Sequence, residues 1–256
     1  MRELILVAQD PTAYGEDWGK PGAICELLDK LQQVDGIRWI RILYAYPERI
    51  SDAFIAAMVR NTKVVPYLDL PIQHCDDAVL KAMNRRGGRK EIEDAIARLR
   101  AAIPGITLRT TLIAGFPGET EEQYAELCDF VKTVKFDRLG CFAYSAEENT
   151  VAARMPNQIE DEVKQRRADH IMELQAEVSA EREGEKVGHT YECICDGVDD
   201  ETGMYLLRTK ADCPEIDGNV LTPADTPLEE GAFYNVTVTD ADTYDLYGYV
   251  EEKLED

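Results

Sequence analysis

The feature that most constrains the fold is a fivefold alternation of short apolar segments with segments of helical periodicity. Between the apolar segments, apolar residues recur every three or four positions, as on the buried side of a helix. The apolar segments are Glu3–Ala8, Trp39–Tyr44, Val64–Leu70, Leu108–Ile113 and Leu139–Tyr144. Runs that are apolar throughout are typical of strands buried on both faces of a parallel sheet. The alternation over about 145 residues therefore predicts an α/β fold with a parallel sheet, doubly wound or barrel-like.

The stretch Arg109–Thr120 indicates how one of these units would form a binding edge. Its strand runs into a turn that contains Gly115 and Gly118, and Thr120 and Gln123 then mark a helix start at capping-box spacing. Such a turn presents free backbone N–H groups and a positive helix end to a ligand. Glycine also fills turns for steric reasons alone, so this stretch by itself is equally compatible with a purely structural role.

Polar or aromatic residues follow each of the five strands. In a parallel sheet the C-terminal strand ends meet on one rim, and ligands gather there. The five segments are Gln9-Asp10, Tyr44–Pro47, Pro71–His74, Gly115–Glu119 and Tyr144-Ser145. Each segment has a structural explanation when taken singly, and a histidine such as His74 is more often a hydrogen-bonded rim residue than a catalyst. Five such ends on one rim favour a binding site.

The pattern changes twice in the C-terminal part of the chain. Residues 156–186 read as a long charged helix with a thin apolar stripe of Val163, His170, Ile171, Leu174 and Val178. From 187 the period becomes two, with Gly, Asp and Pro turns, which predicts a small antiparallel β-barrel of about 65 residues. We therefore expect an α/β part at 1–155, a linker helix at 156–186 and a barrel at 187–256.

The seven cysteines favour reduced thiols over disulfides, because their number is odd and their spacing is irregular. Cys193 and Cys195 are interpreted as two residues on the same face of a strand, with a metal pair as the less favoured alternative. No run of 18 apolar residues and no signal-like start occurs, which predicts a cytoplasmic protein without a membrane segment. The oligomeric state stays open.

The negative charge is concentrated in the expected barrel. Residues 187–256 carry 18 Asp or Glu against Arg208, Lys210 and Lys253, a net charge of −15, which leaves −7 of the total of −22 to the first 186 residues. Such a surface repels nucleic-acid phosphates and attracts basic proteins. Solubility alone is an equally weighted explanation.

Several segments together resemble the RimO-type branch of the methylthiotransferases, which are radical S-adenosylmethionine (SAM) enzymes with a C-terminal TRAM barrel. The resemblance covers essentially the whole chain and is most specific in the first 150 residues. The matching segments are Leu6–Gly15, Leu43–Pro47, Tyr67–His74, Arg109–Thr120 and Phe142–Thr150. Asn149 stands where the family usually has glycine, and asparagine tolerates the left-handed backbone that this turn would need.

The resemblance implies a partial (βα)6 radical SAM barrel of about five βα units, followed by a TRAM barrel. It implies SAM as cofactor and two 4Fe–4S clusters in the full-length family, with the CxxxCxxC cluster ligands expected upstream of residue 1. The isolated chain is therefore expected to be inactive, and none of its residues is expected to bind metal.

By the same resemblance, the rim residues surround SAM. Gln9 and Asp10 would lie near the methionine end, Gln73 and His74 near the ribose, and Arg109 at the carboxylate. The turn from Gly115 to Glu119, with Tyr144 and Ser145, would lie on the adenine side. An arginine such as Arg109 suits a carboxylate because its guanidinium binds it with two parallel hydrogen bonds.

Three functions remain open on the sequence. The first is part of an enzyme that adds a methylthio group to the β-carbon of an aspartate in a basic small-subunit ribosomal protein, with the acidic barrel contacting that protein. The second is the similar tRNA-modifying MiaB branch, which the charge of −15 disfavours because tRNA binding calls for a basic surface. The third is a non-catalytic module whose acidic barrel binds a basic protein.

Overall fold

A five-stranded parallel sheet forms the first part of the molecule. The computed structural model describes residues 2–223 and 227–255, so 224–226 and 256 of the expected barrel segment lie outside the described residues. The strands follow one another in chain order across the sheet. They are β1 (Glu3–Leu6), β2 (Trp39–Ile42), β3 (Val64–Asp69), β4 (Thr107–Ala114) and β5 (Arg138–Ala143). All four neighbouring pairs are parallel, as the sequence predicts.

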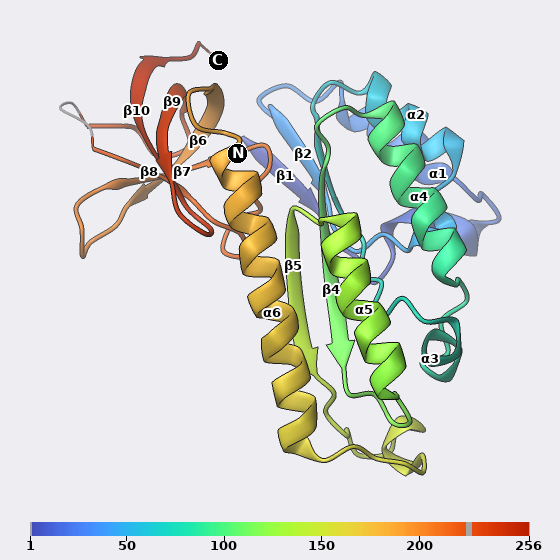
Figure 1. The fold of residues 1–256 in the computed structure, drawn as a ribbon. Helices are drawn as coiled ribbons and strands as arrows, with labels where there is room; N and C mark the ends of the chain where they lie inside the picture. Colours follow the sequence, from blue (N-terminus) through green and yellow to red (C-terminus); the bar gives the residue numbers. More distant parts are fainter. Residues whose placement is uncertain (1, 224–226, 256) are drawn as a thin grey trace.

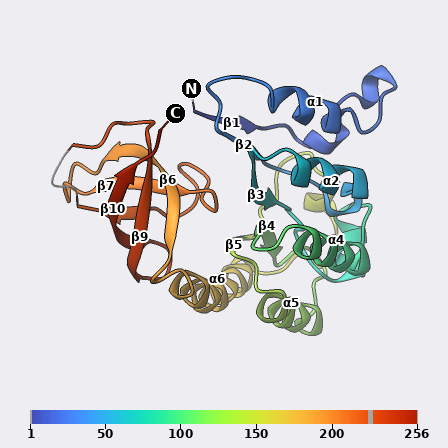
Figure 2. The same cartoon turned by 90° about the horizontal axis from the view of Figure 1, so that it is seen from above.

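The helices that connect these strands lie along the outer face of the sheet (Figures 1 and 2). They are α1 (Ala23–Leu31), α2 (Asp52–Arg60), α4 (Arg89–Ala102) and α5 (Glu121–Val134), while the short α3 (Asp77–Ala82) lies near the strand ends. Strands in chain order with these helices on one side indicate a partial barrel and not a doubly wound sheet. Side chains of Ser51, Asp76 and Thr120 cap α2, α3 and α5.

Alternate residues of each strand point to opposite faces of the sheet. In β4, Leu108 and Leu112 are fully buried in the core beneath the outer helices. The intervening residues Arg109, Thr111 and Ile113 line cavities outside that core, so they face the inner, concave side. The prediction that β1 is buried on both faces was wrong: it is an edge strand, and all four of its residues are only partly buried.

The long helix α6 (Asp161–Gly184) packs along β5 and α5 and leads to the second part of the molecule (Figure 1). Its predicted apolar stripe was partly wrong. Ile171, Leu174 and Val178 are buried, but His170 is exposed and bonds Tyr124. The buried face also contains polar and charged side chains, namely Lys164, Arg167, Gln175, Ser179 and Glu183.

The second part is a closed five-stranded barrel in the order β10-β8-β7-β6-β9. The strands are β6 (Thr190–Val198), β7 (Tyr205–Thr209), β8 (Val220–Thr222), β9 (Phe233–Ala241) and β10 (Leu246–Lys253). Cys193 and Cys195 point into its core, as their spacing in the strand predicts. The barrel is not wholly antiparallel, because β8 and β10 pair in parallel where the ring closes.

The barrel packs against the concave face of the sheet near the N-terminal strand ends. The Trp39 ring meets the edge of Phe233 at 4.9 Å, and Tyr67 Oη donates to Asp217 Oδ2 at 2.7 Å. Arg138 of β5 forms ion pairs with Asp212 of the barrel and with Glu183 of α6, at 2.7 and 2.6 Å. These contacts leave uncovered the half of the concave face near the C-terminal strand ends. Within the described residues, no helix is long and apolar enough to cross a membrane.

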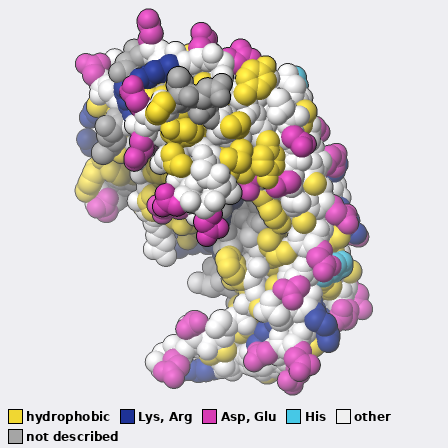
Figure 3. Space-filling view, turned by 90° about the vertical axis from the view of Figure 1, so that its left-hand side faces the viewer, with side chains coloured by type: hydrophobic (Ala, Val, Ile, Leu, Met, Phe, Trp, Pro, Cys, Tyr) yellow, Lys and Arg dark blue, Asp and Glu magenta, His cyan; other side chains and the backbone are white. Residues whose placement is uncertain are grey.

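Acidic side chains are scattered over the side of the molecule on which the barrel lies (Figure 3). This view also shows apolar side chains gathered on the upper part, and the molecule is hollowed between that part and its lower end. The lower end holds the loops that follow the C-terminal strand ends (Figure 1).

Candidate functional site

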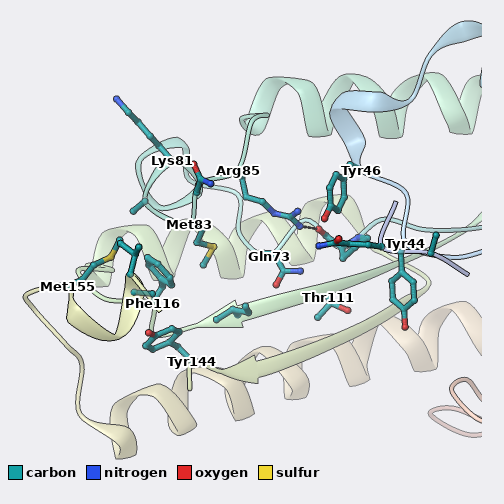
Figure 4. Close-up of a pocket in the computed structure, with 18 residues that line it drawn as sticks. Tyr44, Tyr46, Gln73, Lys81, Met83, Arg85, Thr111, Phe116, Tyr144 and Met155 are labelled. Atoms are coloured by element: carbon teal, nitrogen blue, oxygen red, sulfur yellow. Dashed lines mark hydrogen bonds between the residues drawn. The ribbon is translucent and has the colours of Figure 1, made fainter. Parts of the chain in front are cut away.

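A cavity of about 1120 Å³ opens at the C-terminal ends of the parallel strands (Figure 4). Its lining is contributed by the segments after all five strands, by the inner face of β4, and by the end of α3 with the chain that follows it. The lining residues used below are Gln9, Tyr44, Tyr46, Gln73, Met83, Arg85, Thr111, Ile113, Phe116, Tyr144 and Met155.

The loop after β3 places Gln73 in the middle of this cavity. Its backbone N–H donates to the Thr111 carbonyl at 2.9 Å, and its carbonyl accepts from the Ile113 N–H at 2.8 Å. This pairing extends the sheet by one bridge and holds Gln73 at φ 71°, a left-handed conformation that is uncommon for a residue other than glycine. Tyr44 has φ 65° at the neighbouring strand end. Strained backbone of this kind clusters at ligand-binding sites.

Apolar and aromatic side chains form one wall of the cavity. The Phe116 and Tyr144 rings meet edge to face at 5.2 Å, and Lys164 Nζ lies 5.5 Å from the centre of the Tyr144 ring. Tyr144 Oη is buried and has no hydrogen-bond partner in the described part of the chain. A wall of this type suits a flat ring system that also accepts or donates a hydrogen bond at its edge.

A buried polar cluster supports the cavity from beneath. Glu119 Oε2 accepts from the Gly115 N–H at 3.0 Å and lies 3.4 Å from His74 Nε2. Glu119 Oε1 forms an ion pair with Arg167 of α6 at 2.7 Å. His74 Nδ1 accepts from the Asp76 N–H at 3.0 Å.

This cluster corrects the expected contacts of His74, Gly115 and Glu119 with a ligand. The His74 and Glu119 side chains are fully buried; His74 accepts from the Asp76 N–H, and Glu119 bonds Gly115 and Arg167. A Cβ on Gly115 would lie 3.0 Å from Lys164 Cα, so Gly115 faces α6 and not the cavity. These three residues hold the loops that form the rim, and none of them lines the cavity.

Arg109 also lies elsewhere than expected, on the inner face of β4 where the barrel covers it. It pairs with Asp69 at 3.0 Å and lies 3.8 Å from Asp217 of the barrel. Burial raises the pKa of Asp69, and the charge of Arg109 partly offsets this. Arg109 therefore joins the two parts of the molecule and is not placed to bind a carboxylate at the rim.

Asp10 and Ser145 lie at the rim but are bonded within their own loops. Asp10 accepts from the Thr12 N–H at 3.0 Å and pairs with Arg49 at 2.6 Å. Ser145 Oγ donates to Glu147 Oε1 at 3.0 Å. Asp10 lines a second cavity of about 900 Å³, which adjoins the first and shares several lining residues with it.

The structure thus brings together Gln9, Gln73 and Tyr144 from the residues proposed on the sequence. The sequence interpretation missed Thr111 and Ile113, although the strand period places them on the face opposite Leu108 and Leu112. It also missed residues of the segments after α3 and β5, namely Met83, Arg85, Val151, Ala152 and Met155, for which no strand end gave a signal.

No cluster of cysteines lies at this site. In the described residues, no group of three or more His, Cys, Asp or Glu side chains could hold a metal ion. All seven cysteines are free thiols, and none of them lines the cavity. Burial raises the pKa of Cys75 and of Cys141 to about 12, so neither is a ready thiolate ligand.

Two family models match the chain. The model of the radical SAM superfamily matches residues 1–131, and that of the TRAM domain matches residues 187–250. The matches correspond to the parallel sheet with its helices and to the closed barrel. They confirm the predicted fold class.

Curated relatives of high similarity carry the name ribosomal protein uS12 methylthiotransferase RimO. Those of Thermoanaerobacter sp. and Clostridioides difficile are 44% identical over 248 and 254 residues, and that of Lachnoclostridium phytofermentans is 46% identical over 251 residues. These alignments cover 97 to 99% of this chain and 56 to 57% of the relatives. The chain therefore spans little more than half the length of the curated relatives it matches.

Among solved structures, the coproporphyrinogen III oxidase HemN from Escherichia coli, described as a radical SAM enzyme, resembles the chain with a TM-score of 0.51. The match covers 60% of this chain and 36% of that one at 19% identity. At this identity the likeness concerns the fold alone.

Proposed function

Because the chain belongs to the radical SAM superfamily, we propose that its rim cavity binds SAM as part of a methylthiotransferase that modifies ribosomal protein uS12. The target would be the β-carbon of an aspartate. The observation that carries this proposal is the convergence of Gln9, Gln73 and Tyr144 on one cavity at the C-terminal strand ends, where parallel α/β folds bind their ligands.

The residues of the cavity fit the cofactor. Its volume exceeds the ~300 Å³ at which small-molecule sites begin. Tyr144 Oη, which is buried and has no partner within the described residues, and the side-chain amides of Gln9 and Gln73 would supply hydrogen bonds to the nucleoside. Phe116 and Ile113 would cover its rings and exclude water.

When bound, SAM would supply the radical chemistry of the family together with a 4Fe–4S cluster. The residues of this chain would hold and orient the cofactor and shield its reacting end from water. The described residues do not fit a cluster, since their cysteines are dispersed and no group of three or more metal-ligating side chains lies together. We therefore assign no cluster to residues 1–256 and do not expect them to perform the radical step alone.

The acidic barrel supports a protein partner over an RNA partner. Its 18 acidic residues against 3 basic ones would repel tRNA phosphates, which disfavours the tRNA-modifying alternative. A basic ribosomal protein suits the same surface. The non-catalytic alternative is weaker, because a module that only binds a protein has no need of a cofactor-sized cavity at the strand ends.

A binding and modification assay tests this proposal. Immobilised residues 1–256 should retain purified uS12 and no tRNA, and mass spectrometry should find the recovered uS12 without an added methylthio group. Substitution of Asp240→Asn, Glu251→Gln and Glu252→Gln on the exposed side of β9 and β10 should weaken retention. Retention of tRNA at physiological salt would favour the RNA-modifying alternative. A methylthio group on uS12 would refute the expectation that residues 1–256 do not perform the radical step alone.

A further inference from the structure

Arg85 stands out because it is half-buried and has no acidic partner. In a chain of 50 acidic and 28 basic residues, several arginines near the concave face are paired with carboxylates. Arg41 pairs with Glu3, Arg49 with Asp10 and Glu16, and Arg138 with Glu183 and Asp212. Among the described residues, no carboxylate forms an ion pair with Arg85. The Arg85 guanidinium therefore lies at the rim cavity without a carboxylate partner among the described residues, although the protein is strongly acidic.

The local structure fixes this guanidinium in place. Asn84 ends the turn after α3 in a left-handed conformation, φ 59°, and the Arg85 N–H donates back to the Leu80 carbonyl at 2.9 Å. The side chain extends toward Tyr46, where its guanidinium carbon lies 4.8 Å from the ring centre (Figure 4). Arg85 Nη2 donates to the Pro71 carbonyl. Stacking and this one bond leave Nε and Nη1 without a partner in the described part of the chain.

Arg85 also lies where the two rim cavities meet. It lines both the cavity of about 1120 Å³ and the adjoining cavity of about 900 Å³, together with Gln9 and Tyr46. A planar guanidinium binds a carboxylate through two parallel hydrogen bonds, which the second N–H of Nη2 together with Nε or Nη1 would supply here. Ring stacking holds the guanidinium in advance, so that little conformational freedom is lost on binding.

We propose that Arg85 is a carboxylate receptor at the junction of the two cavities. In this proposal Arg85 has the role of carboxylate ligand that the sequence analysis expected for Arg109, whose side chain is covered by the barrel. The identity of the carboxylate rests on the proposed function: it belongs either to the amino-acid end of SAM, entering from the first cavity, or to the aspartate of the protein substrate, entering from the second. Both sources present the same chemistry to the same guanidinium.

Calorimetric titration of residues 1–256 with paired ligands tests this assignment. One pair is SAM and decarboxylated SAM, and the other is N-acetyl-aspartate methylamide and N-acetyl-asparagine methylamide. We expect wild type to prefer the carboxylate-bearing member of one pair by about 10- to 100-fold, because charge-assisted hydrogen bonds contribute that much. The pair that shows the preference identifies the source.

The Arg85→Ala variant should lose this preference while the carboxylate-free member binds as before. Arg85→Lys should restore only part of it, because an ammonium lacks the planar fork. Arg86→Ala is the matched control, since it removes the neighbouring exposed charge outside the first cavity and should keep the preference for SAM. Unchanged melting temperatures show that each variant is folded.

The outcomes separate this inference from the proposed function. If wild type binds neither SAM nor decarboxylated SAM, the proposed cofactor site is wrong. If it binds both but Arg85→Ala keeps every preference for a carboxylate, the role of Arg85 is refuted while the proposed function stands.

Discussion

Replacing Arg138 by methionine is expected to lower the free energy of unfolding by about 3–5 kcal/mol, because removal of one partner leaves buried charges uncompensated. Arg138 sits between Glu183 and Asp212, whose side chains are 1 and 2% exposed. Methionine fills a similar volume but offers no donor, so both carboxylates lose Arg138 at once, and among the described residues only Lys186 and Thr209 still contact Glu183 and Asp212, respectively. Urea unfolding of residues 1–256 and of the variant measures the difference.

A triple variant is the control for this prediction. Arg138→Met combined with Glu183→Gln and Asp212→Asn removes all three charges together, and it should lose clearly less stability than Arg138→Met alone. A triple variant that is as unstable as the single one would show that packing and not charge accounts for the loss.

The ion pairs of Arg138 with Glu183 and Asp212 also predict how the effect of Arg138→Met on stability depends on pH. Burial raises the pKa of Asp212, but the charges of Arg138 and Lys186 and the bonds from Thr209 outweigh burial and lower it below the ordinary value of 3.8. A lowered folded-state pKa contributes stability above pH 3.8 that is lost as the pH falls through the folded-state value. The loss caused by Arg138→Met should therefore shrink on acidification.

Gly115→Ala should lower the free energy of unfolding by about 2–5 kcal/mol. One part is the cost of a left-handed backbone in a residue other than glycine, and the other is the cost of overpacking. Gly115 has φ 76°, and an added Cβ would lie 2.8 Å from Lys164 Cβ and 3.0 Å from Lys164 Cα. Because the nearest backbone belongs to α6, the helix itself would have to shift. Thermal or urea unfolding reports the loss.

Gly118→Ala is the matched control within the same turn. Gly118 has φ 87°, yet nothing lies within 4 Å of a Cβ built there. Gly118→Ala should therefore lower the free energy of unfolding only by the cost of the left-handed backbone, about 1–2 kcal/mol. Equal losses at the two glycines would contradict the packing of α6 against the rim turn.

Much of the architecture follows from the order of elements along the chain. The five strands, the caps at Ser51, Asp76 and Thr120, and the buried faces of α4 and α5 are set by local periodicity and by side chains that bond neighbouring backbone groups. The rim position of Gln9, Gln73 and Tyr144 follows from the common direction of parallel strands.

The remaining errors concern contacts between distant segments. Arg109 has the chemistry of a carboxylate receptor, but the sequence does not show that the barrel covers its half of the concave face and supplies Asp217. His74 and Glu119 were taken as ligand contacts, whereas both are buried and Glu119 pairs with Arg167, 48 residues further along the chain than Glu119. Arg85 was missed because it follows a short helix and not a strand.

The central claim is that SAM binds in the rim cavity over the inner face of β4. Calorimetric titration of SAM into residues 1–256 and into an Ile113→Trp variant tests it most directly, since Ile113 lines the cavity together with Gln73 and Phe116. Wild type should bind one SAM, and the indole should weaken binding at least about tenfold, the equivalent of 1.4 kcal/mol. Val59→Trp on the exposed side of α2 is the matched control and should bind as wild type does. Absence of binding by wild type, or equal binding by Ile113→Trp, would contradict the account.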